Sequence, residues 1–279
     1  MTSNLYKPKQ AKIIKELKIT PVFDVHHEIS MRLTYLKNYL RQSQKKSYVL
    51  GLSGGIDSTV AGILSQMAVR ELCHENYPAQ FIGLRLPYGV QKDEADASLA
   101  VNYINPDRCL TFNIKPICDS FLAVLELGKT DFESDSHKDF ILGNIKARQR
   151  MVIQYALAGI NDGLVIGTDH GAEALMGFFT KFGDGACDLT PLTGLNKRRI
   201  KKIAEQLKVP EQIIFKCPTA DLENLAPLRP DEDSYGVTYE QIDDFLEGKL
   251  MENDAYQIIF KAFEATRHKR KLPDVPDTI

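Results

Sequence analysis

The residues best suited to chemistry lie in one short stretch, Ser53-Gly54-Gly55-Ile56-Asp57-Ser58-Thr59. Adjacent glycines let the backbone turn with positive φ and approach a ligand closely, while hydroxyl side chains add hydrogen bonds to a phosphate. Asp57 would repel a bare phosphate unless a cation lay between them, so Asp57 is a candidate magnesium ligand. The alternative for the same residues is a glycine turn followed by an ordinary helix cap.

Two regular elements flank this stretch and would position it. The apolar run Tyr48–Leu52 is typical of a buried strand, and from Ser58 onward apolar residues recur at helical spacing. A strand, a glycine turn and a helix in this order bring the unpaired N–H groups of the helix N-terminus to the turn, where they can bind an anion. We therefore expect a phosphate site at the turn.

The same alternation of strand and helix continues along the chain. Because alternating elements build a parallel sheet covered on both faces, we predict an α/β fold with a doubly wound parallel sheet, in one domain over residues 1–279. Residues 168–195 are rich in glycine and lack periodicity, which favours a functional loop region. The further strands are expected at 81–86, 108–114 and 164–167, and the helices at 24–42, 92–104, 117–127, 139–160, 197–207, 239–246 and 256–268.

Composition excludes several classes of protein. Of 279 residues, 35 are Lys or Arg and 37 are Asp or Glu, so there is no bulk basic field to drive nucleic-acid binding. The apolar runs are too short for a membrane span and no secretory signal is visible, so a cytoplasmic location with no membrane partner is expected. The five cysteines form no CxxC pair, which favours reduced structural thiols over a disulfide frame or a zinc site.

The glycine stretch is neither a Walker A loop nor a GxGxxG fingerprint. Its pattern, SGGxDS, resembles the pyrophosphate-binding loop of the N-type ATP pyrophosphatases, which cleave ATP between the α and β phosphates and adenylate an acceptor. Within that superfamily the chain is similar nearly end to end to the ammonia-dependent NAD synthetases. The blocks that carry this resemblance are 51–58, 85–91, 143–151, 167–173, 177–185, 218–222 and 268–269.

The resemblance implies a Rossmann-like fold of the adenine-nucleotide-hydrolase type and the conversion of deamido-NAD to NAD with ATP, Mg²⁺ and ammonia. In that reaction the nicotinate carboxylate attacks the α-phosphorus, pyrophosphate leaves, and ammonia then displaces AMP. Glutamine-dependent relatives carry an additional amidotransferase domain for which this chain has no room, so free ammonia is the expected donor. A separate glutaminase subunit is the open alternative.

The resemblance also implies residue roles on the ATP side. Magnesium would be held by Asp57 and Glu173, and these two residues with Lys197 would be catalytic. Taken alone, Glu173 is equally typical of a first-turn acid in a helix, and Lys197 lies in a basic run that is usually solvated. The implied ATP-binding residues are Gly51, Leu52, Ser53, Gly54, Gly55, Ile56, Asp57, Ser58, Arg85, Gln91, Thr168, Lys197 and Thr219.

For deamido-NAD, cations are expected because the substrate carries a pyrophosphate and a carboxylate. Each of the implied residues, taken singly, is equally typical of surface charge. The base that deprotonates ammonia stays open among Asp169, His170 and Asp221. The residues that the resemblance implies for deamido-NAD are Arg148, Lys181, Asp188, His268 and Lys269.

The family's homodimer, with deamido-NAD at the subunit interface, is expected here too. The apolar stripe from Val25 to Leu40 is a candidate dimer face, and burial within the subunit is the alternative for it. Rival functions are another enzyme of the superfamily, such as a GMP-synthetase-like amidating subunit or a tRNA-thiolating enzyme, and a non-catalytic nucleotide-binding protein on the same fold.

Overall fold

The fold is built on a four-stranded parallel sheet with the strand order β3-β2-β1-β4. The structure is a computed structural model, and it describes residues 3–90, 94–128, 131–219, 222–226 and 229–276. A parallel bridge between Ile166 and Leu189 extends the β4 edge. The strands are β1 (Ser47–Gly51), β2 (Gln80–Arg85), β3 (Arg108–Thr111) and β4 (Gly163–Val165).

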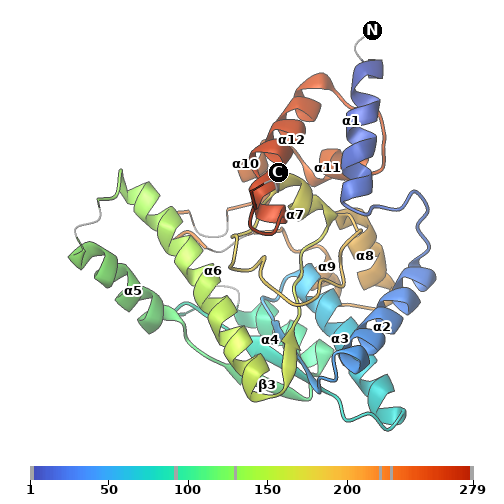
Figure 1. Ribbon diagram of the computed structural model, residues 1–279, viewed down its shortest axis with the longest axis vertical. Coiled ribbons are helices and arrows are strands. Elements are labelled where there is room, and N and C mark those ends of the chain that lie inside the picture. Colours follow the sequence, from blue (N-terminus) through green and yellow to red (C-terminus); the bar gives the residue numbers. More distant parts are fainter. Residues whose placement is uncertain (1–2, 91–93, 129–130, 220–221, 227–228, 277–279) are drawn as a thin grey trace.

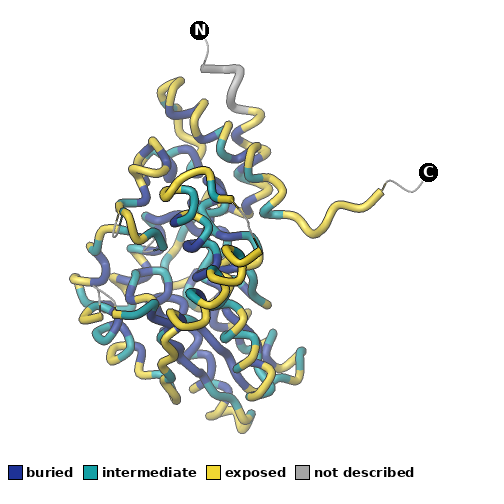
Figure 2. Tube along the Cα trace, turned by 90° about the vertical axis from the view of Figure 1, so that its left-hand side faces the viewer, coloured by how far each residue is buried: buried dark blue, intermediate teal, exposed yellow. Residues whose placement is uncertain are grey.

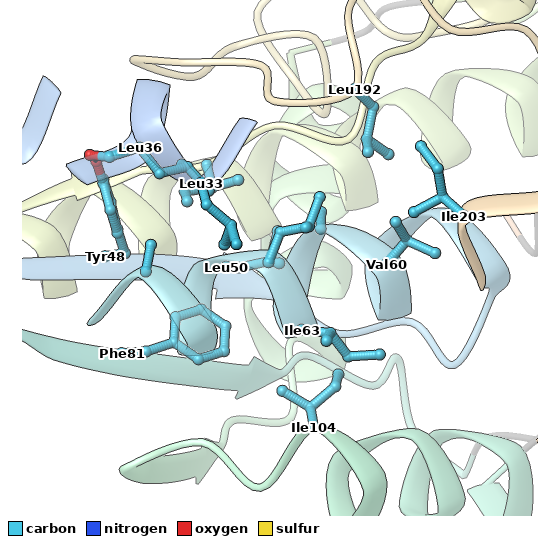
Figure 3. Close-up of a cluster of buried hydrophobic side chains, with 14 of the residues drawn as sticks. Leu33, Leu36, Tyr48, Leu50, Val60, Ile63, Phe81, Ile104, Leu192 and Ile203 are labelled. Carbon is cyan, nitrogen blue, oxygen red and sulfur yellow. The ribbon is translucent and has the colours of Figure 1, made fainter. Parts of the chain in front are cut away.

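Helices cover both faces of the sheet because side chains alternate along each strand. Tyr48 and Leu50 of β1 pack with α2, α3 and α4 in one core (Figure 3), and Val49 packs on the opposite face with α5 and α6. The predicted doubly wound α/β fold is therefore confirmed. The helices are α2 (Val25–Gln42), α3 (Ile56–His74), α4 (Glu94–Ile104), α5 (Lys115–Leu127) and α6 (Asp135–Ile160).

A third core lies beyond the sheet, where helices from the two ends of the chain meet (Figure 1). Phe245, Tyr256 and Phe263 fill this core, and the exposed residues 271–276 extend away from it (Figure 2). The helices at or next to it are α1 (Ser3–Glu16), α7 (Gly171–Met176), α8 (Lys197–Gln206), α10 (Asp231–Tyr235), α11 (Tyr239–Leu246), α12 (Asn253–Ala265) and a 3-10 turn (Arg267–Arg270), whereas α9 (Glu211–Ile214) packs in the core of Tyr48 and Leu50, next to α4 and α8.

The predicted loop region 168–195 contains a short helix. In residues 168–195, α7 begins where His170 Nδ1 accepts a hydrogen bond from Ala172 N and ends at Gly177, whose φ is 65°. Caps and tertiary packing stabilise such helices although they are too short to show a periodicity in the sequence.

For the apolar stripe from Val25 to Leu40, the structure shows the alternative reading, burial within the subunit. Leu36 and Leu40 are fully buried and Leu33 is 8% exposed, all within the core between α2, α3 and the sheet. A side chain already buried inside the subunit has no apolar surface left for a partner. The five cysteines are free thiols, as predicted, and no helix of the described residues is long and apolar enough to cross a membrane.

Candidate active site

The glycine turn forms as the sequence predicts, between β1 and α3. Gly54 has a φ of +84°, and a Cβ there would lie 2.7 Å from the backbone nitrogen of Ala97, so only glycine fits. The N-cap of the following helix is Gly55, which has no side chain to accept from the first N–H groups, and the hydroxyls of Ser58 and Thr59 donate to the Gly55 carbonyl. The first N–H groups of α3 are therefore available to an anion at the turn.

Two carboxylates and an imidazole meet beside this turn. Asp57 lies in the first turn of α3, Glu173 lies in the first turn of α7, and His170 caps α7. One ligand atom from each of the three lies within 4.8 Å of the others. The side chains of Asp57 and Glu173 keep 18% and 21% exposure, so solvent reaches both carboxylates, whereas that of His170 is fully buried.

The imidazole of His170 directs an N–H group at this cluster. Its Nδ1 accepts from Ala172 N at 3.2 Å, so a neutral ring carries its proton on Nε2. That Nε2 lies 3.5 Å from Asp57 Oδ1 and 3.6 Å from Glu173 Oε2. Burial lowers the pKa of His170 to about 3, so the ring is neutral at physiological pH and is directed at two carboxylates.

Lys197 completes the cluster from the start of α8. Its Nζ lies 2.7 Å from Asp57 Oδ2 and 5.0 Å from the ring centroid of Tyr239, and the residue is only 3% exposed. Lys197 is thus not part of a solvated basic face. The start of α8 is held by α11, where the Asp243 carboxylate accepts from Lys197 N at 3.1 Å and from Arg198 N at 2.7 Å.

The charged groups in the cluster shift one another's pKa values. Burial would raise the pKa of Asp57, but the charge and hydrogen bond of Lys197 together with His170 outweigh it, and the net pKa lies below its ordinary value. Burial would lower the pKa of Lys197, but the charges of Asp57 and Glu173 together with the Asp57 hydrogen bond outweigh it, and the net pKa is raised. Burial and the Asp57 charge both raise the pKa of Glu173 well above its ordinary value. The cluster therefore holds one firm ion pair and a second carboxyl that a further cation would help to ionise.

The residues present fit a magnesium ion. Mg²⁺ prefers carboxylate oxygens and keeps several water ligands, and Asp57 and Glu173 offer two carboxylates within reach of solvent. Asp57 Oδ1 and His170 Nε2 are buried atoms that have no hydrogen-bond partner among the described residues. Such a carboxylate oxygen needs a partner, which the described part of the chain does not supply, and a bound cation would satisfy Asp57.

Part of the set predicted for deamido-NAD meets at a cavity of about 550 Å³. Lys181 and Lys269 line it together with Asp169 and His170, so the cavity reaches the carboxylate cluster. Lys269 Nζ donates to the carbonyls of Gly177 and Phe179, each at 2.9 Å. The lining thus includes cationic side chains, which are suited to an anion.

The other predicted residues on this side lie outside the cavity lining. Arg148 is exposed, but its NH2 reaches the Lys181 carbonyl at 3.4 Å, so it lies next to the cavity. Asp188 Oδ2 accepts from Val165 N at 2.7 Å, which ties the following loop to β4. His268 is exposed on the 3-10 turn.

The remaining ATP-side predictions lie in three places. Arg85 forms an ion pair with Glu94, whose Oε1 is 2.6 Å from Arg85 NH1. Thr168 follows β4 directly before the carboxylate cluster, and Thr219 forms an antiparallel bridge with Pro230. Gln91, and Asp221 among the candidate bases, lie outside the described residues.

Comparison with known proteins agrees with this geometry. The family model of NAD synthase matches residues 28–273. An NH(3)-dependent NAD(+) synthetase of Paraburkholderia phytofirmans is 53% identical over 276 residues, covering 99% of this chain and 96% of that protein. The chain belongs to the NAD synthase family.

Solved structures of this NAD synthase family share the fold of the chain. The crystal structure of an NAD+ synthetase from Burkholderia pseudomallei is 48% identical, with a TM-score of 0.83, over 96% of this chain and 97% of that one. An NMN synthetase from Francisella tularensis is 34% identical, with a TM-score of 0.80, over 92% of this chain and all of that one. Similar chains thus include synthetases named for two different nicotinamide products.

Sequence reasoning missed the residues that support Lys197 in this family member. Tyr239 OH donates to Asp231 Oδ2 at 3.0 Å, and its ring packs by the Lys197 ammonium. The helix that carries Tyr239 was predicted with correct bounds, 239–246, and its Thr238–Gln241 capping box marks the start. No local pattern indicates which distant side chain that helix meets, so the contact had no signal in the sequence.

Proposed function

We propose that this protein is an ammonia-dependent NAD synthetase, which uses ATP to convert the carboxylate of deamido-NAD into the amide of NAD. The observation that carries the proposal is the distance of 2.7 Å between the Lys197 ammonium and Asp57. Asp57 lies in the first turn of the helix that follows the glycine turn, and Glu173 lies beside it. Full-length similarity to NAD synthetases supports it. The basic, partly apolar cavity next to this cluster supports an anionic second substrate.

The chain's own residues would mainly position and neutralise charge. The N–H groups at the start of α3 would bind phosphate oxygens of ATP, and Lys197 would stabilise the negative charge that accumulates as pyrophosphate leaves. We propose Asp57 and Glu173 as the ligands of Mg²⁺, which when bound would withdraw charge from the phosphate under attack. His170, neutral and with its Nε2 3.5 Å from Asp57 and 3.6 Å from Glu173, would orient both carboxylates.

The second step needs a group that takes a proton from ammonium or from the attacking amine. Burial raises the pKa of Asp169 to about 7, and the Asp184 charge adds to the rise. Asp169 also lines the cavity with Lys181 and Lys269. His170 is a poorer base, because its Nδ1 already accepts a hydrogen bond and its pKa is about 3. We propose Asp169 as the base among the predicted candidates.

The decisive experiment follows three products together. Purified protein is incubated with ATP, Mg²⁺, an ammonium salt and either deamido-NAD or nicotinic acid mononucleotide, and AMP, pyrophosphate and the amide product are quantified. Equal amounts of NAD, AMP and pyrophosphate, formed fastest from deamido-NAD, are expected. Preference for the mononucleotide would instead place this chain with the NMN synthetase that it resembles. If ATP is cleaved with neither acceptor, the proposed activity is wrong and the alternative of a non-catalytic nucleotide-binding protein is favoured.

We also propose a homodimer, through a face different from the one predicted. Helices α5 and α6 project together from the sheet (Figure 1) and expose large apolar side chains. Val124, 64% exposed, lies on this face, and Val124→Asp should give monomers in light scattering. The matched control Leu250→Asp, at a position 68% exposed elsewhere, should leave the dimer intact. The exposed apolar residues of the face are Ile117, Phe121, Val124, Leu127 and Phe140.

A monomeric wild-type protein, or a dimer that Val124→Asp does not change, would contradict this interface. The cytoplasmic location stays a prediction that fractionation of the source cells can test.

A further inference from the structure

Helix α6 carries two buried charged residues that both contact one distant segment. The Lys146 ammonium donates to Leu222 O and to Asn224 Oδ1, each at 2.7 Å. The Asp139 carboxylate accepts from the backbone N–H groups of Asn224 at 2.9 Å and Leu225 at 2.7 Å. Lys146 is 2% exposed and Asp139 is 7% exposed. Buried charges are costly unless they are paired or hydrogen-bonded, and here the loop supplies the partners.

A glycine between these two charges lets the segment approach the helix. A Cβ on Gly143 would lie 3.2 Å from Leu222 Cβ and 3.4 Å from Leu222 O, which is tight enough that the loop would have to shift. Glycine is otherwise unfavourable inside a helix, by about 1 kcal/mol relative to alanine. We call Asp139, Gly143 and Lys146 the loop seat.

Lys146 also contacts the segment that follows β2. Its Nζ lies 4.1 Å from the ring centroid of Tyr88, a cation–π distance. Tyr88 is held in turn by a hydrogen bond from its hydroxyl to Asp119 of α5. One buried ammonium therefore contacts both the segment that follows Arg85 and the segment 222–225 that lies near Thr219 in the chain, and both Arg85 and Thr219 are residues that the resemblance assigns to ATP.

We propose that the loop seat is a positioning device for ATP: it holds residues 222–225 against α6 and so places the neighbouring Thr219 backbone for the nucleotide. The proposal rests on the proposed function. The three residues do not touch ATP themselves, and they act through the loop. Packing alone does not account for the seat, because an apolar helix face would hold a loop without burying an ammonium and a carboxylate.

The chain offers a matched pair of glycines for the test. Gly143 and Gly159 both lie inside α6, and a Cβ on Gly159 would meet nothing within 4 Å. Both Gly143→Ala and Gly159→Ala should favour the helix, so Gly159→Ala is expected to raise the thermal midpoint by about 2 °C. Only Gly143→Ala should displace the loop. We expect it to bind α,β-methylene ATP with Mg²⁺ about tenfold more weakly by calorimetry, an increase in Kd that a loss of overall stability would not explain.

Two further variants address the hydrogen bonds. Lys146→Met should raise the KM for ATP about tenfold while the KM for deamido-NAD and the kcat at saturating ATP change less than about twofold. Asn224→Ala, at an exposed loop position that does not threaten the fold, should act in the same direction more weakly. Equal nucleotide affinity of Gly143→Ala and Gly159→Ala, or a Lys146→Met variant with unchanged KM for ATP, would overturn the loop seat. A wild-type protein that binds no ATP analogue would instead overturn the proposed function itself.

Discussion

The Lys197 ammonium lies 2.7 Å from the carboxylate of Asp57, although 140 positions separate the two residues along the chain. Asp57 starts the helix after the glycine turn and Lys197 starts α8, so two helix N-termini bring opposite charges together. The pair is largely withdrawn from water, which strengthens its attraction and makes either partner costly to leave alone. Glu173 and the neutral His170 adjoin it.

Removing the Lys197 ammonium should lower the rate of NAD formation strongly and the free energy of unfolding moderately. Lys197→Met is expected to lower the rate of NAD formation at least about a hundredfold, because the charge on the leaving pyrophosphate loses its partner. It should also lower the free energy of unfolding by about 3 kcal/mol, since Asp57 is left without its counter-charge. Product chromatography and urea denaturation measure the two effects. Lys202→Met, at an exposed position on the same helix, is the control, and a variant at Lys197 with full activity would contradict the role.

The second carboxylate should govern the requirement for magnesium. Glu173→Gln is expected to raise the Mg²⁺ concentration for half-maximal activity at least about tenfold, because one of two charged oxygen ligands is lost. Asp57→Asn should abolish turnover while the circular dichroism spectrum stays unchanged. Titration of activity with Mg²⁺ measures the first effect, with the exposed Glu240→Gln as control. An unchanged magnesium dependence in Glu173→Gln would remove Glu173 from the metal site.

The ring of Tyr239 should contribute more to kcat than its hydroxyl does. Tyr239→Phe keeps the ring beside the Lys197 ammonium and loses the hydrogen bond to Asp231, so about a threefold loss of kcat is expected. Tyr239→Leu also loses the ring, and at least about a further fivefold loss should follow. Steady-state kinetics at saturating ATP compare the two. Equal loss in both variants would mean that only the hydroxyl contributes.

The contact between α8 and α11 should make the free energy of unfolding depend on pH in the acidic range. Burial would raise the pKa of Glu247, but hydrogen bonds from Asn196, Lys249 and Arg198 outweigh it and lower the pKa from its ordinary 4.5 to about 2. A carboxyl whose pKa is lower in the folded state contributes stability above its unfolded value, and this contribution is lost as pH falls from about 4.5 toward 2.

The matching variant is Glu247→Gln, and its effect should vanish in acid. It is expected to lower the free energy of unfolding by about 1 kcal/mol at pH 7, a value that allows for screening at a partly exposed site. The difference from the wild type should shrink toward zero near pH 2. Urea denaturation across this range measures it, with the exposed Glu205→Gln as control. A difference that is constant with pH would show that the carboxylate charge is not involved.

Much of the fold was predictable because its signals are local. The bounds of α11 agree with the prediction at both ends, and the strand, turn and helix around Gly54 form as expected. The helix α7 and the stripe of α2 show where local signals fail. A six-residue helix has too few turns to show a period, and an apolar stripe indicates that a face is buried without naming what buries it.

The sequence by itself determined the glycine turn, the order of strands and helices, and the resemblance that names Asp57, Glu173 and Lys197. These properties depend on residues adjacent in the chain, where φ preferences, periodicity and motif spacing act directly. Only the tertiary structure decided which charges meet: the Lys197–Asp57 pair, the ring of Tyr239 beside it, and the seat that Lys146 offers to a loop. Such contacts arise from how whole elements pack, and packing depends on the complete set of buried surfaces.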